Sequence, residues 1–240
     1  VNPSDSTTPY DDAFRTLLTY CPQLVLPLLN EIFGTDYRGD ERIERSDNEQ
    51  FTIGSGGRES KQITDSTFIV HGSLPLRYHL ECQSTEDGTI IIRMMQYDFH
   101  IALTDSYDDN GTLVVPLPLS AVLYLRGSGN KSETMTVRIE SEDQSREHRV
   151  RVIRLGSYDL QTIFDKELLF LIPFYLFRYE NQFPAMNPAE ENIENEGEAA
   201  LAKLFEDYRQ IGAFLKKKES VMELTTYEKW VIIEMTKKVI

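Results

Sequence analysis

The fold is decided by residues 63–83, which read ITDSTFIVHGSLPLRYHLECQ. Two runs rich in β-branched and aromatic residues flank the polar segment HGSLP, a pattern that predicts two antiparallel strands joined by a tight turn. A turn centred on Ser73 pairs residues whose numbers sum to 146, and this register sets Asp65 directly opposite Glu81. The two predicted strands are 63–70 and 76–83.

Side chains alternate along a strand, so the second strand has one polar face and one core face. The polar face carries Arg77, His79, Glu81 and Gln83, and the core face carries Leu76, Tyr78, Leu80 and Cys82. In the first strand the same rule places Phe68 and Val70 on the core face and Asp65 on the polar face. The Cβ atoms of Asp65 and Glu81 are therefore expected to lie about 4.5–5.5 Å apart.

Two carboxylates at this distance repel each other unless a cation lies between them. A divalent metal ion is the simplest counter-charge, and Mg²⁺ fits better than Zn²⁺ because the ligands are oxygens without a His/Cys cluster. Gln83, about 6.6 Å further along the same face, is placed to orient a water or a phosphate oxygen. The tripeptide pattern Glu-x-Gln, formed here by Glu81-Cys82-Gln83, is by itself weak evidence for a metal site, since Glu142-Asp143-Gln144 also matches it. Solvent-facing acids on a half-exposed hairpin are the ordinary alternative.

Helical and strand patterns alternate in the rest of the chain. Residues 11–20 and 24–33 have apolar side chains at helical spacing and end at Gly34, and residues 89–104 follow the same period. Three further strands are predicted over 120–126, 133–140 and 148–155. A helix broken at Pro173 is predicted over 159–177, an acidic linker over 187–198, and helices over 199–218 and 222–240. This order predicts an α/β or α+β sheet with helical cover.

Composition limits the partners. The formal charge of −14 over 240 residues argues against tight, sequence-independent binding of duplex DNA, although a local basic groove or a bound metal can outweigh the net charge. The longest apolar run, 168–177, is too short to span a bilayer, so no membrane partner is expected. The first residues lack the features of a signal peptide, and two cysteines indicate no disulfide framework. A cytoplasmic location is the expectation.

Several segments occur together in a recognisable order. They are YDDAFR at 10–15, LLNEIF at 28–33, Asp65, LECQS at 80–84, Arg93, Tyr97, AVLYL at 121–125 and LFLIPFY at 169–175. Their order resembles the PD-(D/E)XK nuclease superfamily, and specifically its transposase-like branch of recombination-promoting nucleases. The resemblance covers roughly residues 10–180.

The resemblance implies a restriction-endonuclease-like domain over residues 1–186, with a mixed central sheet flanked by helices, that cuts DNA with Mg²⁺ or Mn²⁺. The implied metal ligands are Asp65, Glu81 and the main-chain carbonyl of Cys82, and a second metal ion is left open. Gln83 completes the implied catalytic set at the position usually held by Lys. This is the main departure from the family pattern, because Gln offers no positive charge to the scissile phosphate. Residues 187–240 are expected to pack on the core or to extend from it.

Four further residues are candidates for the site. Arg93 and Tyr97 share one face of the predicted helix 89–104, where Arg93 could contact phosphate near the helix N-terminus. The alternative for Arg93 is a surface ion pair with Glu86 or Asp98. Asp11 and Glu31 could each add an acid to the site, or they could be capping or solvated helix residues. The four histidines have no ligand-like spacing, and His79 is at most a neighbour of the site.

Two functions from different classes follow. The first is a Mg²⁺-dependent DNA endonuclease, linked through the resemblance to recombination or transposition. The second is a catalytically inactive nuclease-fold domain kept as an interaction module, which the acidic charge and the missing Lys favour. The basic runs suited to DNA contact are also consistent with solvated surface, and a homodimer is left open. These runs are Arg146, Arg149, Arg151 and Arg154, and Lys216 to Lys218.

Overall fold

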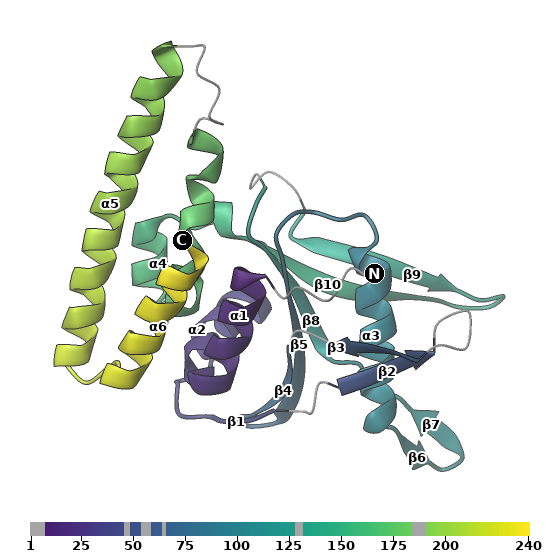
Figure 1. Ribbon diagram of the computed structural model, residues 1–240. Helices are drawn as coiled ribbons and strands as arrows, with labels where there is room; N and C mark the ends of the chain where they lie inside the picture. Colours follow the sequence, from purple (N-terminus) through teal and green to yellow (C-terminus); the bar gives the residue numbers. More distant parts are fainter. Residues whose placement is uncertain (1–7, 46–48, 54–58, 64–65, 128–131, 184–190) are drawn as a thin grey trace.

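A mixed six-stranded sheet with helices on both faces forms the centre of the molecule (Figure 1), which confirms the predicted α/β or α+β class. The computed structural model describes residues 8–45, 49–53, 59–63, 66–127, 132–183 and 191–240. In spatial order the strands are β1 (Arg42–Arg45), β4 (Ser66–His71), β5 (Pro75–Gln83), β8 (Leu119–Tyr124), β10 (Ser145–Arg154) and β9 (Thr134–Glu140).

Strands β1, β4 and β5 are antiparallel, whereas β5, β8 and β10 run parallel to one another. Helix α3 (Ile90–Thr104) makes the long connection from β5 towards β8 that a parallel pair requires. The β4–β5 pairing runs from Ser66 opposite Leu80 to His71 opposite Pro75, so every described pair sums to 146 and the predicted register is confirmed there. Asp65 lies outside the described residues, and its pairing with Glu81 stays a prediction.

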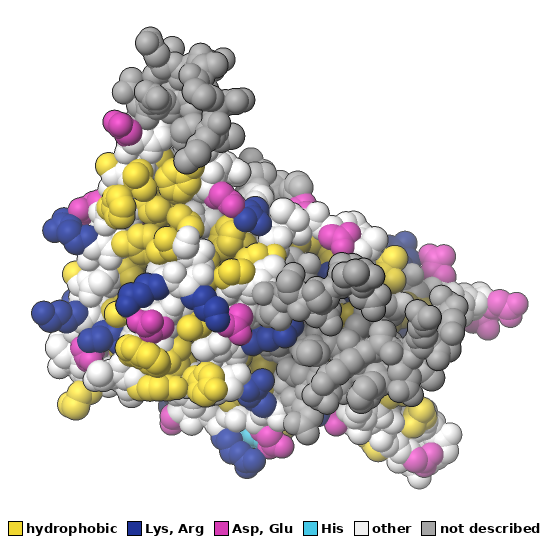
Figure 2. All heavy atoms as spheres, in the orientation of Figure 1, with side chains coloured by type: hydrophobic (Ala, Val, Ile, Leu, Met, Phe, Trp, Pro, Cys, Tyr) yellow, Lys and Arg dark blue, Asp and Glu magenta, His cyan; other side chains and the backbone are white. Residues whose placement is uncertain are grey.

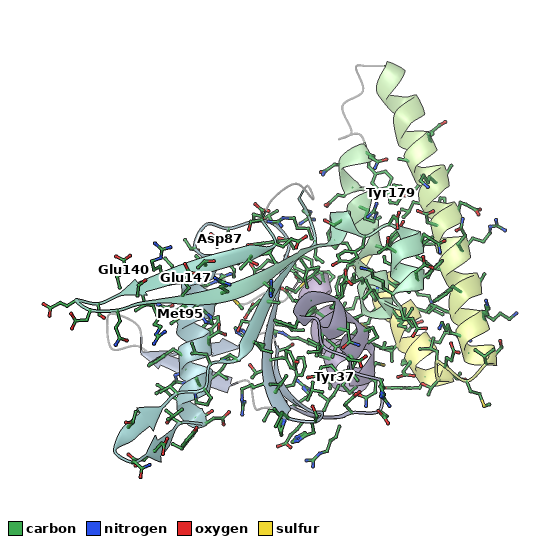
Figure 3. The ribbon with its side chains drawn as sticks, turned by 180° about the vertical axis from the view of Figure 1, so that it is seen from behind. Tyr37, Asp87, Met95, Glu140, Glu147 and Tyr179 are labelled. Atoms are coloured by element: carbon green, nitrogen blue, oxygen red, sulfur yellow. The ribbon has the colours of Figure 1, made fainter. Side chains whose placement is uncertain are left out.

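One layer of helices covers the face of the sheet opposite α3. It consists of α1 (Pro9–Tyr20), η1 (Pro22–Val25), α2 (Leu26–Phe33), α4 (Leu160–Asp165), the 3₁₀ helix η3 (Leu169–Arg178), α5 (Glu191–Ser220) and α6 (Thr226–Val239). Seen from behind in Figure 3, Met95 marks α3 beneath the β9 and β10 strands, and Tyr179 lies in the helical layer. Shorter elements are η2 (Leu155–Ser157), η4 (Glu180–Gln182), the β2–β3 hairpin (Glu49–Ile53 with Glu59–Ile63) and the β6–β7 hairpin (Tyr107–Asp109 with Thr112–Val114).

The two faces of the sheet carry different side chains. Phe68, Val70, Tyr78, Leu80 and Cys82 face the helical layer and belong to the larger hydrophobic core, as alternation predicts. That core also contains residues of α5 and α6, so the C-terminal helices pack on the rest of the chain. The α3 face has a smaller apolar cluster, formed by Ile90, Met94, Val122, Tyr124, Val150 and Val152. The polar face of β5 is therefore covered rather than open to solvent.

The observed elements differ from the predicted ones in several places, among them β2 and the β6–β7 hairpin, which no predicted strand covers. The helix predicted over 159–177 is divided, because Glu167 adopts a left-handed conformation (φ 56°) between α4 and η3. Helix α5 begins at Glu191, inside the stretch predicted as a linker, where the sequence is rich in the good helix formers Glu and Ala. Strand β1 was not predicted, because this largely exposed edge strand, RIER, has no apolar alternation.

Large apolar side chains remain exposed on the C-terminal helices, and Figure 2 shows hydrophobic side chains gathered over the helical layer. Phe205 on α5 is 65% exposed, and Trp230 on α6 is 56% exposed and lies beside the ring of Tyr227. Among the described helices, none combines the length and apolar character that a bilayer span requires.

Candidate functional site

The candidate site is built on the polar face of β5, an interior strand of the sheet. His79 is fully buried there and Glu81 is only 6% exposed, because α3 covers this face. The sequence left open that these acids face solvent on a half-exposed hairpin. Glu81 does not, and a carboxylate withdrawn from water in this way needs polar partners.

Those partners form one buried chain of hydrogen-bonding groups. His79 Nε2 lies 3.3 Å from Glu81 Oε1, and His79 Nδ1 lies 2.6 Å from Asp98 Oδ1 on α3. The other oxygen of Asp98, Oδ2, lies 2.7 Å from Nε2 of His148 on β10. Ser120 of β8, the strand between them, is close enough to Asp98 to help lower the pKa of its carboxyl. We call Glu81, His79, Asp98 and His148 the buried network.

The buried network fixes the charge of His79. Both nitrogens of its ring face carboxylate oxygens, so both must donate protons when Glu81 and Asp98 are ionised. Burial lowers the pKa of His79, but hydrogen bonds and charges of Asp98 and Glu81 outweigh burial and raise that pKa to about 9. Burial likewise raises the pKa of Asp98, yet hydrogen bonds from His148 and His79 outweigh it and bring the pKa below its ordinary value. The network thus pairs a buried cation with buried anions.

This pairing predicts a loss of stability at alkaline pH. Because folding raises the pKa of His79 from 6.5 to about 9, its contribution is complete below about pH 6.5 and disappears as pH rises through 9. The free energy of unfolding is expected to fall by about 3 kcal/mol over this range. Urea unfolding at pH 6 and pH 9.5 measures this loss of free energy. The substitution His79→Gln should make the free energy of unfolding depend less on pH. An equal loss of unfolding free energy between pH 6 and pH 9.5 in the wild type and in His79→Gln would contradict a charged His79.

The carboxyl ends of three parallel strands meet beside Glu81. Gln83 of β5 pairs with Tyr124 of β8, which pairs with Arg154 of β10, so these side chains share a row on the α3 face. Arg154 is only 8% exposed, and its Nε lies 3.0 Å from Glu86 Oε1. Arg154 therefore differs from the other members of its predicted basic run, Arg146, Arg149 and Arg151, which are exposed. In open α/β sheets, ligands bind at such carboxyl ends.

Helix α3 runs antiparallel to β5. Arg77 is paired with Asp105 (2.6 Å), and His79 with Asp98, about two turns earlier in the helix. Residues further along β5 therefore face earlier turns of α3, so Glu81 is expected to face the N-terminal part of this helix, which contains Arg93. The N-terminus of α3, where Asp87 accepts a hydrogen bond from the Thr89 N–H, lies beyond the end of β5.

Arg93 and Tyr97 lie on the β5 side of α3, one turn apart. The Tyr97 ring contacts the His79 ring edge-on, with 6.1 Å between centroids. The two partners considered for Arg93 are engaged elsewhere, Asp98 by two histidines and Glu86 by Arg154. The Arg93 Nε is buried and has no hydrogen-bond partner among the described residues. Arg93 is therefore a cation in the first turn of α3, on the side of the helix that faces β5.

Asp11 and Glu31 lie in the helical layer, on the other face of the sheet. Asp11 accepts a hydrogen bond from the hydroxyl of Thr8 (2.6 Å) and forms a capping box at the start of α1. Glu31 lies 2.7 Å from Nζ of Lys166. The structure does not bring either acid to Glu81, and their placement follows the capping and solvated-face alternatives.

The donors beside Glu81 suit a hard cation. The carbonyl of Gln83 accepts from the Leu125 N–H of the β8 side. Because successive carbonyls of a strand alternate between its neighbours, the Cys82 carbonyl is directed towards the β4 side, where Asp65 is predicted. An all-oxygen set of this kind fits Mg²⁺ or Mn²⁺. Within the described part of the chain, no three His, Cys, Asp or Glu side chains are grouped to hold a metal, so the predicted ligand set depends on Asp65.

Sequence reasoning missed Asp98 and His148 and undervalued His79. Asp98 and His148 are 50 positions apart, so no spacing pattern connects them. One signal was present: Asp98 falls on the apolar stripe of α3 with Ile90, Met94 and Ile101, and all four are buried. An acid on a core-facing stripe requires a buried partner.

The chain matches no protein-family model, no curated protein and no solved structure. What the site does must therefore be inferred from its own residues. Those residues are the buried carboxylate Glu81, Gln83 two positions further along the same strand, and Arg93 on the helix that covers this face.

Proposed function

We propose that this chain is a divalent-metal-dependent DNA endonuclease of the PD-(D/E)XK type, acting through Glu81. One observation carries the proposal: Glu81 is held buried on an interior strand, at the end of the sheet where β5, β8 and β10 finish and α3 begins. The mixed sheet flanked by helices fits the fold that the resemblance implies. DNA as substrate, the cytoplasm as location and a link to recombination or transposition rest on the resemblance.

Asp65, Glu81 and the Cys82 carbonyl would hold Mg²⁺ or Mn²⁺. When bound, the cation supplies a counter-charge to phosphate and a water of lowered pKa. Gln83 shares the face of Glu81, and the oxygen of its side-chain amide can accept a hydrogen bond from an attacking water and thereby orient it. It cannot neutralise the charge that develops on the phosphate.

Arg93 supplies the positive charge that Gln83 lacks. Arg154 is engaged by Glu86, whereas Arg93 lies in the first turn of α3 and has a buried Nε without a hydrogen-bond partner among the described residues. A guanidinium binds two phosphate oxygens with parallel hydrogen bonds. The N-terminal amides of α3 favour an anion at the same end of the helix.

The first test is cation-dependent nicking of supercoiled plasmid. We expect open-circular product with Mg²⁺ or Mn²⁺ and none with EDTA, because phosphodiester hydrolysis here requires the metal-bound water. Nicking that continues at an equal rate in EDTA would contradict the proposal. Absence of nicking together with absence of Mn²⁺ binding would favour the alternative below.

Arg93→Ala is expected to slow nicking about tenfold to a hundredfold, the cost of removing one donor to a developing charge. Arg93→Lys should recover part of the rate, because it restores the charge without the fork of donors. The matched control is Arg149→Ala, which removes an exposed arginine paired with Glu147 on β10. Single-turnover nicking rates decide the matter, and equal losses in Arg93→Ala and Arg149→Ala would argue against a role for Arg93.

A second candidate function is an interaction module without catalysis. The exposed apolar side chains of α5 and α6, among them Phe205 and Trp230, favour it, because such side chains gather at protein interfaces. So does the net charge of −14, which opposes binding to DNA. A second copy of the chain is the simplest partner. Sedimentation of the wild type and Phe205→Ala distinguishes a dimer formed through this surface from a monomer.

A further inference from the structure

We propose that His79 and Asp98 are positioning residues, which set the orientation of the Glu81 carboxylate from the buried side of the site. This inference rests on the proposed role of Glu81 at the site. The residues themselves touch neither the metal nor DNA, because both are fully buried behind Glu81. Their effect passes through the contact between His79 Nε2 and Glu81 Oε1.

The His79 ring is held on three sides. Asp98 Oδ1 engages Nδ1 at 2.6 Å, the Tyr97 ring contacts the imidazole edge-on, and Glu81 Oε1 faces Nε2 at 3.3 Å. A ring whose Nδ1 is anchored to a carboxylate presents its Nε2 in one direction. That direction is along β5, towards the residue two positions further on.

Asp98 is itself anchored to two strands that are not neighbours. One oxygen binds His79 of β5, and the other binds His148 of β10, across the intervening strand β8. Val150 and Val152, on the same face of β10 as His148, pack in one cluster with Ile90 and Met94 of α3. A shift of Asp98 would therefore break both contacts of the carboxylate and disturb a packed cluster.

A buried carboxylate outside the buried network, Asp207, shows what a purely structural role looks like. Asp207 on α5 accepts hydrogen bonds from Tyr175 (2.9 Å) and Tyr179 of the helical layer, and Lys203 lies 3.8 Å away. Its partners fasten α5 to neighbouring segments and do not reach the face of Glu81. Asp207→Asn is thus a matched control for the loss of one buried carboxylate.

The test compares Mn²⁺ affinity by calorimetry in wild type, Asp98→Asn and Asp207→Asn, at a temperature where circular dichroism shows all three folded. Loss of an outer group that orients a metal ligand, as Asp98 does through His79, weakens binding about tenfold to a hundredfold. We expect that loss in Asp98→Asn and wild-type affinity in Asp207→Asn. Wild-type affinity in Asp98→Asn, or equal losses in both variants, would overturn the positioning role.

A crystal structure of Asp98→Asn gives a readout that needs no metal. An Asn side chain has one acceptor oxygen where Asp98 has two, so it cannot accept from both His79 and His148, and the ring of His79 loses the anchor that directs its Nε2 at Glu81. We expect the Glu81 carboxylate to turn away from its position 3.3 Å from His79. An unchanged Glu81 would overturn positioning. Failure of the wild type to bind Mn²⁺ would instead overturn the proposed function, and this structure would still decide on positioning.

Discussion

Glu81→Gln is expected to slow Mg²⁺-dependent plasmid nicking by about a hundredfold to a thousandfold, as the loss of several kcal/mol of transition-state stabilisation requires. The substitution keeps the size of the side chain and an oxygen that can accept from His79, so the fold should persist. It removes the negative charge that the metal requires. Single-turnover nicking rates at saturating Mg²⁺ measure the effect, and circular dichroism confirms folding.

The chain offers an internal control for this substitution. Glu142 belongs to the same tripeptide pattern, Glu-x-Gln, but it is exposed in the turn between β9 and β10, close to Glu140 at the end of β9 (Figure 3). Glu142→Gln should nick at the wild-type rate. Equal rates in Glu81→Gln and wild type would remove Glu81 from the chemistry, whatever the fold.

Among the proposed substitutions, Phe170→Ala should lower the free energy of unfolding most, by about 3–5 kcal/mol, the cost of deleting a phenylalanine side chain from a packed core. Phe170 is fully buried and meets Phe14 edge-on, with 5.3 Å between ring centroids, so it joins η3 to α1. Urea unfolding measures the change, and Phe205→Ala on the exposed face of α5 should stay within about 0.5 kcal/mol of wild type. A loss below about 1 kcal/mol in Phe170→Ala would contradict this packing.

The hairpin at the centre of the fold could be predicted because its information is local. Alternation along β5 separates Tyr78, Leu80 and Cys82 from His79 and Glu81, and each set lies on its predicted face. The register followed from the turn around Ser73, since a slip by one residue would expose the core set. Helix α3 could also be predicted from local information, because its apolar side chains recur at helical spacing from Ile90 onwards.

The covering of the site could not be predicted in this way. Whether Glu81 faces water depends on where α3 packs, which is a contact between elements and not a property of the strand. The buried network depends on three separate elements, because α3 carries Asp98 between His79 of β5 and His148 of β10. Strand β1 is recognisable only through its pairing with β4, since its residues are polar and largely exposed.

Diffraction from a crystal soaked in Mn²⁺, recorded for anomalous scattering, tests the central claim most directly. We expect an anomalous peak within bonding distance of a Glu81 carboxylate oxygen, on the side of the Cys82 carbonyl, and loss of that peak in Glu81→Gln. Mn²⁺ peaks found only elsewhere on the protein, or the same peak in wild type and Glu81→Gln, would contradict it.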